Sequence, residues 1–504
     1  MNNGKICVSV CAETADKFID KIKQAAQFAD VIELRFDCLD ENEIDTVVTH
    51  IAELAVNKPL LATFRSPEQG GNLQITVEQR KEFWKNLPTT FWAADLEEDI
   101  VDVQPASENR ILSFHDFDRV PTNLTEVYDR LAAHGAVVKI AVHANDITDA
   151  IPLWKLLERA KSEDRQLIPI AMGEGGKWTR ILGLAHGSPL TYASLESGSE
   201  TAPGQISARD LTEIYRAKTL DENTAVYGII GGNTSYSMSP YIHNAAFAAK
   251  NLDKVFVPLQ TADLDEFIRR MVNPETREIE LNFAGFSVTA PHKQAIIRHL
   301  DEIDESAKTI AAVNTIKIVN GKLYGFNTDA EGFIGPLKNS YGDLGDARVA
   351  VVGAGGAACA CVYALRKEGA AVTIFARDPE KAKSLADEFG TKFESLPKTK
   401  DQRPKADFFD YDIFVNTTPL GTKGISEHET VATADQLKNV KLVYDIIYNP
   451  VETRLLREAK TAGARTINGL EMLIGQAVRQ FEIWTGIDAP KDTMRQAVRL
   501  KANS

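Results

Sequence analysis

The stretch from Arg348 to Asp378 reads RVAVVGAGGAACACVYALRKEGAAVTIFARD. A buried-type run (349–352) leads into a glycine-rich turn, a helix and a second apolar run that ends at Phe375. This is G-x-G-x-x-A in a strand–turn–helix setting, where backbone N–H groups and the helix N-terminus cradle a pyrophosphate. We therefore expect a dinucleotide-binding Rossmann lobe, and Cys359 and Cys361 on its first helix are interpreted as packing residues. The expected cofactor contacts in the turn are Gly353, Ala354, Gly355, Gly356 and Ala357.

The residues after the second apolar run bear on the choice of cofactor. An Asp or Glu there binds the ribose of NAD, whereas a nearby Arg accommodates the 2′-phosphate of NADP. Arg377 and Lys381 therefore favour NADP. Asp378 leaves two alternatives open, since it could accept hydrogen bonds from ribose hydroxyls or cap the next helix.

Upstream of the Rossmann motif, three strings carry candidate chemistry. NTSYSMSPYIHN places Ser237 and Ser239 two residues apart, FSVTAPHK ends in Lys293, and GFNTDAEGF contains Asp329. A Lys/Asp pair could move a proton to or from an alcohol while a nicotinamide exchanges a hydride. The alternative is a surface salt bridge without catalytic function.

The first 220 residues contain eight short apolar or β-branched runs separated by helix-like segments. The runs are 6–11, 31–37, 60–65, 91–97, 110–116, 137–143, 167–173 and 190–194. Their spacing is about 26 residues, the length of one βα unit, so the sequence predicts a (β/α)₈ TIM barrel.

Chemistry in such a barrel lies at the C-terminal ends of the strands. Lys139 lies in the sixth run, where burial would remove the solvation of its charged form and free the amine to attack a carbonyl. A lysine that snorkels to the rim is the alternative. His115, one run earlier, could supply the base that an iminium requires, and His143 is interpreted as structural or rim-exposed. Arg65 and Arg180 could hold a substrate carboxylate, or could pair with barrel glutamates.

The N-terminal half resembles type I 3-dehydroquinate dehydratase. The resemblance rests on ELR (33–35), TFRSPEQGG (63–71), SFHDF (113–117), VKIAV around Lys139, MGEGGKWTR ending in Arg180, and TAPGQ (201–205). It implies that Lys139 forms a Schiff base with 3-dehydroquinate, that His115 moves the protons and that Glu33 orients His115 and the substrate. The implied substrate contacts are Glu33, Arg35, Arg65, Arg180, Thr201 and Gln205. Two departures are Gln69 in place of a frequent Glu and Thr201 in place of a frequent Ser.

Residues 225–504 resemble shikimate dehydrogenase. The resemblance implies catalysis by Lys293 and Asp329, and substrate contacts from Ser237, Ser239, Thr289, Asn314, Tyr448 and Gln476. NTTPLG (416–421) and NGLEML resemble segments beside the nicotinamide, which adds Thr417 and Gly469 to the cofactor contacts. Departures are Tyr236 for a common His, Ser287 for a common Asn, and Ala376 and Asp378 on either side of Arg377.

Composition limits the classes of partner. The 504 residues are 44% apolar and 25% charged, with a net charge of −14, which argues against nucleic acid or an anionic membrane as the main partner. No export signal or membrane span is recognised, so a cytoplasmic location is expected. Five cysteines without a paired framework are interpreted as free thiols of a reducing compartment.

We thus expect an α/β protein of three domains: a barrel (1–220), a substrate-binding domain (221–345 and 473–504) and an NADP-binding Rossmann domain (346–472). The resemblances imply 3-dehydroquinate, 3-dehydroshikimate and shikimate as substrates, with no metal because Lys139 itself activates the ketone. The short linker near 220 is compatible with a monomer that holds both sites. Two alternatives are an oxidative quinate or shikimate dehydrogenase and a metabolite sensor without turnover.

Overall fold

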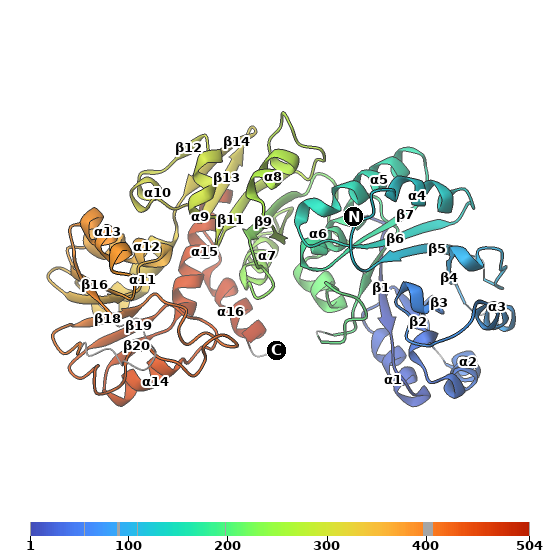
Figure 1. Ribbon diagram of the computed structural model, residues 1–504, viewed down its shortest axis with the longest axis horizontal. Helices are drawn as coiled ribbons and strands as arrows, with labels where there is room; N and C mark the ends of the chain where they lie inside the picture. The colour runs from blue at the N-terminus through green and yellow to red at the C-terminus, as the bar shows by residue number, and fades with distance from the viewer. Residues whose placement is uncertain are drawn as a thin grey trace. The chain divides into compact units, whose positions relative to one another are not determined.

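The computed structural model describes residues 2–54, 56–87, 91–107, 109–196, 198–396 and 407–502 (Figure 1). Two compact units divide the chain. The first comprises Met1–Pro240 and Asn251–Ala284, and the second comprises Tyr241–Lys250 and Gly285–Ser504. The predicted boundary at residue 220 therefore lies inside the first unit.

Eight parallel strands form the barrel of the first unit, as the spacing of the apolar runs predicts. They are β1 (Lys5–Val10), β2 (Val31–Arg35), β3 (Leu60–Thr63), β4 (Ala93–Glu97), β5 (Asn109–Asp116), β6 (Val137–His143), β7 (Leu167–Met172) and β8 (Leu190–Ala193). Their order is β7-β6-β5-β4-β3-β2-β1-β8, and contacts between β7 and β8 nearly close the barrel. The predicted barrel is confirmed.

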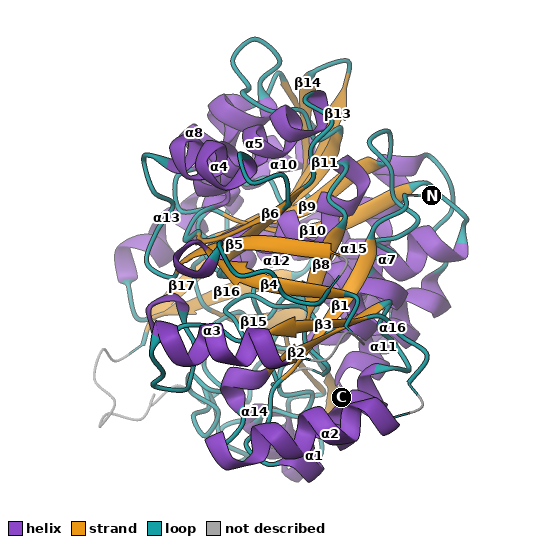
Figure 2. Ribbon diagram, turned by 90° about the vertical axis from the view of Figure 1, so that its right-hand side faces the viewer, coloured by secondary structure: helices purple, strands orange, loops and turns teal. Residues whose placement is uncertain are grey.

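Helices surround these strands (Figure 2). They are α1 (Ala15–Ala25), α2 (Ile44–Glu53), α3 (Val77–Asn86), α4 (Leu124–Ala132), α5 (Ile151–Ser162) and α6 (Lys177–Leu182). Inside the barrel, one apolar side chain from each of several strands packs into a shared layer, formed by Cys7, Val31, Leu61, Ala93, Ile111, Ala141 and Ile168. Such filling leaves the polar ends of the strands as the place for a site.

Two further parallel strands, β9 (Ala225–Gly231) and β10 (Lys254–Gln260), complete the first unit. Strand β10 contacts α6 of the barrel, and the short helix α8 (Leu264–Phe267) follows it. The Asp146 carboxylate accepts a hydrogen bond from the Ala262 N–H at 2.7 Å, and Lys155 pairs with Glu278 at 2.5 Å. These contacts explain why the compact unit extends beyond the barrel.

The second unit begins with a small mixed sheet. Strand β11 (Phe283–Val288) pairs antiparallel with β13 (Thr315–Val319), which pairs antiparallel with β14 (Lys322–Phe326), and β12 (Glu302–Ile303) lies parallel to β14. The accompanying helices are α7 (Ser239–Ala249, from Tyr241 on), α9 (His292–Ala295), α10 (Glu305–Ile310), α11 (Asp329–Tyr341), α15 (Gly469–Thr485) and α16 (Lys491–Ala502). A Cβ on Gly332 would meet the α15 backbone at Met472 and Gln476, so α11 and α15 approach closely at this glycine.

The remaining sheet has six parallel strands in the order β17-β16-β15-β18-β19-β20. They are β15 (Arg348–Val352), β16 (Ala371–Ala376), β17 (Lys392–Ser395), β18 (Ile413–Asn416), β19 (Leu442–Asp445) and β20 (Arg465–Ile467). Val349 and Val351 pack on one face with α12 (Gly356–Lys367) and α13 (Pro379–Phe389), whereas Ala350 and Val352 pack on the other with α14 (Arg454–Thr461). The predicted Rossmann lobe is confirmed.

The prediction of free thiols is wrong for two of the five cysteines. Cys11 and Cys38 form a disulfide, with their Cα atoms 5.3 Å apart. They follow β1 and β2, which are neighbouring parallel strands, so residues just beyond the two C-terminal ends come together. The other three, Cys7, Cys359 and Cys361, are free thiols. Cys361 is buried and Cys359 packs partly buried against the core of the Rossmann lobe, as predicted.

No helix in the described part of the chain is long and apolar enough to cross a membrane.

Candidate active sites

A cavity opens at the C-terminal end of the barrel, and all eight barrel residues predicted for the first site line it. They are Glu33, Arg35, Arg65, His115, Lys139, Arg180, Thr201 and Gln205. They come from six different strands and the segments that follow them, and the barrel brings them together at one end. Ser9, Gln69, Phe117, Met172 and Tyr192 also line this cavity.

Lys139 is the third of the seven residues of β6, and its side chain is only 5% exposed, which excludes snorkelling to the rim. Its Nζ lies 2.9 Å from Asp95 Oδ2 and 3.8 Å from Glu33 Oε1. The same atom lies 4.0 Å from the ring centroid of Tyr192, a cation–π contact. The amine is therefore held between two carboxylates and an aromatic face.

Arg65 adopts the arrangement expected of an arginine that pairs with barrel carboxylates. It binds Asp95 Oδ2 at 2.9 Å and Glu97 Oε1 at 2.8 Å, and it donates to Ser113 Oγ at 2.6 Å. Burial acts to raise the pKa of the Asp95 carboxyl, but Arg65 and Lys139 hold it well below its ordinary value. Asp95 is thus a permanent anion beside the amine and not a proton carrier.

His115, on β5, lies in the same cavity with its imidazole held by Gln69. Gln69 Oε1 accepts from the His115 backbone N–H at 3.0 Å and lies 3.1 Å from His115 Nδ1. Because a backbone N–H can only donate, the atom facing it is the amide oxygen, and Nδ1 therefore carries the proton. Nε2 is left as the basic nitrogen. Burial, with Arg65 and Lys139, lowers the pKa of His115 well below its ordinary value, so the ring is neutral.

The partner of His115 differs from the expected one. The Glu33 carboxylate accepts from Ser9 Oγ at 2.5 Å and from Thr63 Oγ1 at 2.9 Å and lies near Lys139, whereas Gln69 orients the histidine. The loop after β3 brings Gln69 to this place. The sequence singled out Gln69 only as a departure from the family pattern, so its contact with His115 was missed.

Two arginines at the cavity differ in their freedom to bind an anion. Arg35 donates twice to Asp37, at 2.8 and 2.7 Å. Arg180 is buried, donates only to the carbonyls of Tyr192 and Pro203 at 3.3 and 3.4 Å, and its Nε has no partner among the described residues. Burial without a carboxylate lowers the pKa of Arg180 to about 10. A substrate carboxylate would therefore supply the ion-pair partner that Arg180 lacks among the described residues.

Thr201 and Gln205 form one hydrogen-bonded pair at the cavity wall. Gln205 Nε2 donates to Thr201 Oγ1 at 3.0 Å, and Gln205 Oε1 accepts from the Thr201 backbone N–H at 2.8 Å. This pair presents hydroxyl and amide groups, which suit a polyhydroxylated substrate.

The second lysine site lies in the second unit. Lys293 Nζ, on α9, is 2.5 Å from Asp329 Oδ2 at the start of α11. The other carboxylate oxygen accepts from Asn314 Nδ2 at 2.8 Å, and Asn314 Oδ1 accepts from the Thr328 N–H at 2.8 Å. Asp329 and Asn314 are buried, whereas the Lys293 side chain is 25% exposed. Buried Asn314 thus holds Asp329 in place, whereas the Lys293 amine remains accessible from solvent.

The other predicted substrate contacts of this half lie on separate elements. Gln476 lies on α15, whose close approach to α11 at Gly332 brings it near the Asp329 helix. Thr289 follows β11 and Tyr448 follows β19, and both are partly exposed. Ser237 and Ser239 belong to the first unit, where Ser237 Oγ accepts from the Ser239 N–H at 3.2 Å.

The glycine-rich turn has the shape that a dinucleotide requires. Gly353 has φ +122°, and a Cβ there would collide with Thr417 Oγ1. A Cβ on Gly355 or Gly356 would meet open space, so this side of the turn is free at the N-terminus of α12. Thr417 Oγ1 donates to the Val352 carbonyl at 2.8 Å, which fixes the facing loop. Gly469 starts α15, and its Cβ would collide with the backbone at Ile446.

The structure decides between the two interpretations of Asp378. Its carboxylate accepts from the N–H groups of Glu380 and Lys381, so it caps α13. Arg377, which follows β16, and Lys381, in the first turn of α13, are both exposed. The residues present fit NADP. No cluster of three or more His, Cys, Asp or Glu in the described ranges could hold a metal ion.

Comparison with known families agrees with these two sites. The type I 3-dehydroquinase model matches residues 6–222. The shikimate dehydrogenase substrate binding domain matches 229–316, shikimate / quinate 5-dehydrogenase matches 337–468, and the shikimate 5′-dehydrogenase C-terminal domain matches 469–499. The fold and the sites thus define two fused enzyme units, a type I 3-dehydroquinase and a shikimate dehydrogenase.

Individual relatives span one or both units. A chloroplastic bifunctional 3-dehydroquinate dehydratase/shikimate dehydrogenase of Arabidopsis thaliana is 35% identical over 97% of this chain and 83% of its own length. The shikimate dehydrogenase (NADP(+)) of Methanocaldococcus jannaschii is 40% identical over 55% of this chain and 98% of its own. A solved shikimate dehydrogenase in complex with NADP+ matches with a TM-score of 0.52 at 39% identity, covering 57% of this chain and 98% of that one. The chain belongs to the bifunctional 3-dehydroquinate dehydratase/shikimate dehydrogenase family.

Proposed function

We propose that this protein dehydrates 3-dehydroquinate to 3-dehydroshikimate in the barrel and reduces 3-dehydroshikimate to shikimate with NADPH in its second half. The observation that carries the proposal is the pair of separate lysine sites. Lys139 is buried beside a neutral histidine, and Lys293 is tied to a buried aspartate. The product of the first site is the substrate of the second, which accounts for their fusion.

In the barrel, Lys139 Nζ attacks the ketone carbon of 3-dehydroquinate, and loss of water gives a protonated imine. His115 Nε2 removes the proton from the carbon next to the iminium carbon. The same imidazole then protonates the departing hydroxyl, which leaves as water. Hydrolysis of the imine releases 3-dehydroshikimate and restores the amine.

The remaining residues of the cavity hold and orient the substrate. Arg180 receives the carboxylate, because its guanidinium is buried and has no anionic partner among the described residues. Arg35, Arg65, Glu33, Thr201 and Gln205 contact the substrate or the groups that hold it. Asp95 stays ionised and stabilises the positive charge on the lysine nitrogen once the iminium has formed.

In the second half, Lys293 gives a proton to the carbonyl oxygen of 3-dehydroshikimate as it becomes the hydroxyl of shikimate. Asp329 positions the ammonium, and Asn314 fixes Asp329. Substrate contacts from Thr289, Tyr448, Gln476, Ser237 and Ser239 rest on the family resemblance.

NADPH, when bound, supplies the two-electron reduction. We assign its phosphates to the turn of Gly353, Ala354, Gly355, Gly356 and Ala357, its 2′-phosphate to Arg377 and Lys381, and its nicotinamide side to Thr417 and Gly469. The open space at Gly355 and Gly356 and the capping role of Asp378 support this assignment.

A two-step assay from 3-dehydroquinate with NADPH tests the proposal. Full-length protein should consume NADPH from 3-dehydroquinate, and Lys139→Ala should consume it only when 3-dehydroshikimate is supplied. A metabolite sensor would consume none from either compound. Oxidation of quinate in preference to reduction of 3-dehydroshikimate would favour the oxidative dehydrogenase instead.

The location, the oligomeric state and the three domain boundaries are also proposals. We infer a cytoplasmic monomer whose barrel, substrate-binding and NADP-binding domains end near residues 220, 345 and 472, with 473–504 returning to the substrate-binding domain. Fractionation of cells, sedimentation of the purified chain and limited proteolysis test these three points in turn.

A further inference from the structure

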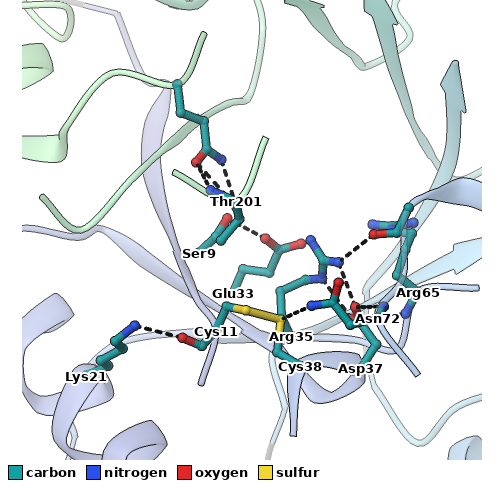
Figure 3. Close-up of a disulfide and its surroundings, with 12 residues drawn as sticks. Ser9, Cys11, Lys21, Glu33, Arg35, Asp37, Cys38, Arg65, Asn72 and Thr201 are labelled. Atoms are coloured by element: carbon teal, nitrogen blue, oxygen red, sulfur yellow. Dashed lines mark hydrogen bonds and ion pairs between the residues drawn. A yellow bond between two sulfur atoms is a disulfide. The ribbon is translucent and has the colours of Figure 1, made fainter. Parts of the chain in front are cut away.

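The Cys11–Cys38 disulfide lies just beyond the C-terminal ends of β1 and β2, at the mouth of the barrel (Figure 3). The bond forms part of the wall of an open hollow that Glu13, Lys17, Asp20 and Lys21 also line. Cys11 is partly exposed, whereas Cys38 is buried. An attacking thiolate therefore has access to the bond from the Cys11 side.

Hydrogen bonds of Asp37, the residue before Cys38, connect the disulfide to the substrate cavity. Asp37, next to Cys38, accepts two hydrogen bonds from Arg35 and one each from the backbone N–H groups of Arg65 and Asn72, at 3.3 and 3.2 Å. The Asn72 side chain also donates to Cys38 Sγ at 3.3 Å. Cys38 is thus part of the hydrogen-bonded cluster that holds Arg35 at the cavity (Figure 3).

The other cysteine is joined to the same cavity along β1. Ser9, two residues before Cys11, donates to Glu33 on β2 at 2.5 Å. The bond therefore ties together two neighbouring strand ends, β1 and β2, from which the cavity takes Ser9, Glu33 and Arg35. A cross-link at this place restricts the segment that carries Arg35.

We propose that Cys11–Cys38 is a site of thiol–disulfide exchange with a protein dithiol, and that the bond sets the affinity of the barrel for 3-dehydroquinate. This inference rests on the proposed dehydratase function. Oxidation keeps Asp37 and Arg35 fixed, and reduction releases the Cys38 segment and weakens substrate binding. The NADPH-dependent half does not respond.

The reduction proceeds through two successive thiol–disulfide exchange steps in which atoms and electrons balance. A thiolate of the dithiol attacks Cys11 Sγ, forms a mixed disulfide and displaces Cys38 as a thiolate, which the Asn72 side-chain N–H faces. The second thiol of the partner then attacks the mixed disulfide and releases Cys11. Two electrons and two protons pass to the protein, and the dithiol leaves as a disulfide.

The thiols of the second half are poor candidates for the same exchange. Burial raises the pKa of the Cys359 thiol to about 12 and that of Cys361 well above its ordinary value. Both are therefore protonated and weakly nucleophilic near neutral pH. They supply a matched control, because Cys359→Ser removes a thiol without touching the barrel.

The test compares oxidised and reduced full-length protein, with dithiothreitol as the dithiol and mass spectrometry to count free thiols. Full reduction should raise the KM for 3-dehydroquinate roughly tenfold, the size expected when a positioned substrate contact is lost. The rate of 3-dehydroshikimate reduction should not change. Diamide should reverse the effect, and Cys359→Ser should respond like the wild type.

Cys11→Ser and Cys38→Ser should each show the high KM and no response to dithiothreitol or diamide, with reduction of 3-dehydroshikimate as the check on folding. An unchanged KM after complete reduction, or failure of diamide to join Cys11 and Cys38, would overturn the inference. Absence of dehydration in both redox forms would instead refute the proposed function.

Discussion

The two lysine sites differ in burial and in what surrounds the amine. Lys139 is 5% exposed and contacts Asp95, Glu33 and the ring of Tyr192, whereas Lys293 is 25% exposed and contacts Asp329 alone among the ion pairs of the described residues. An amine that becomes covalently bound to its substrate as an iminium needs a site that stabilises the cation formed on its nitrogen. A proton donor needs access to the substrate oxygen and one anchoring carboxylate.

Removal of the buried amine is expected to have the largest effect. Lys139→Ala should lower the kcat for dehydration by about 10⁴-fold or more, because Lys139 is the only lysine among the described residues that line the cavity. Reduction of 3-dehydroshikimate should be unchanged. Lys161→Ala, at the exposed Glu222 ion pair, is the matched control. Loss of both activities in Lys139→Ala would contradict two independent sites.

The second comparison removes the partly exposed amine of Lys293. Lys293→Ala should slow reduction of 3-dehydroshikimate by about 10²- to 10⁴-fold, the usual contribution of a general acid. Dehydration should continue at the wild-type rate. A steady-state assay of each half-reaction measures both, with the exposed Lys308→Ala as the control. A normal rate of reduction would show that the pair is only a salt bridge.

The aromatic face under Lys139 is expected to contribute less. Tyr192→Leu should lower kcat for dehydration by about tenfold, because a desolvated cation–π contact contributes up to about 2 kcal/mol. Tyr192→Phe keeps the ring and should retain most activity. Borohydride-trapped adduct, measured alongside the rate, distinguishes weaker imine formation from a packing defect. Equal losses of activity in both variants would show that the hydroxyl of Tyr192, and not its ring, makes the contribution.

The smallest expected effect is a shift in pH dependence. Gln69→Glu places a negative charge against His115 Nδ1, which favours the imidazolium and should raise the pKa of His115. The base must be neutral to act, so the acidic limb of the dehydration profile should move to higher pH. Activity at high pH should change little. Glu68→Gln, on the exposed neighbouring position, should leave the limb in place.

Periodicity and strand-end chemistry predict most of the barrel site. Apolar runs at one regular spacing define the strands, and parallel strands bring their C-terminal ends to one mouth, so Lys139, His115 and Arg180 could be placed together without coordinates. The sequence could not show which side chains form hydrogen bonds or ion pairs with these site residues. Gln69 reaches His115 through a loop, and Arg65, which follows β3, pairs with Asp95 and Glu97 on the neighbouring strand β4.

The disulfide and the helix cap were missed or left open for related reasons. Cys11 and Cys38 are 27 residues apart, close to one βα repeat, which is a usable signal because neighbouring parallel strands start one repeat apart. The prediction of free thiols rested only on the number of cysteines and the lack of a paired framework, so it did not use this spacing. The Asp378 carboxylate could accept hydrogen bonds either from ribose hydroxyls or from backbone N–H groups. Only the backbone conformation at the start of α13 shows that it caps this helix.

The central claim is that the buried lysine is the nucleophile and the exposed one is not. Borohydride reduction of the full-length protein with 3-dehydroquinate, followed by peptide mass spectrometry, tests it most directly. The account predicts a reduced adduct on the peptide that contains Lys139, none on the Lys293 peptide, and complete loss of the adduct in Lys139→Ala. An adduct on Lys293, or dehydration that proceeds with no trapped adduct on Lys139, would contradict it.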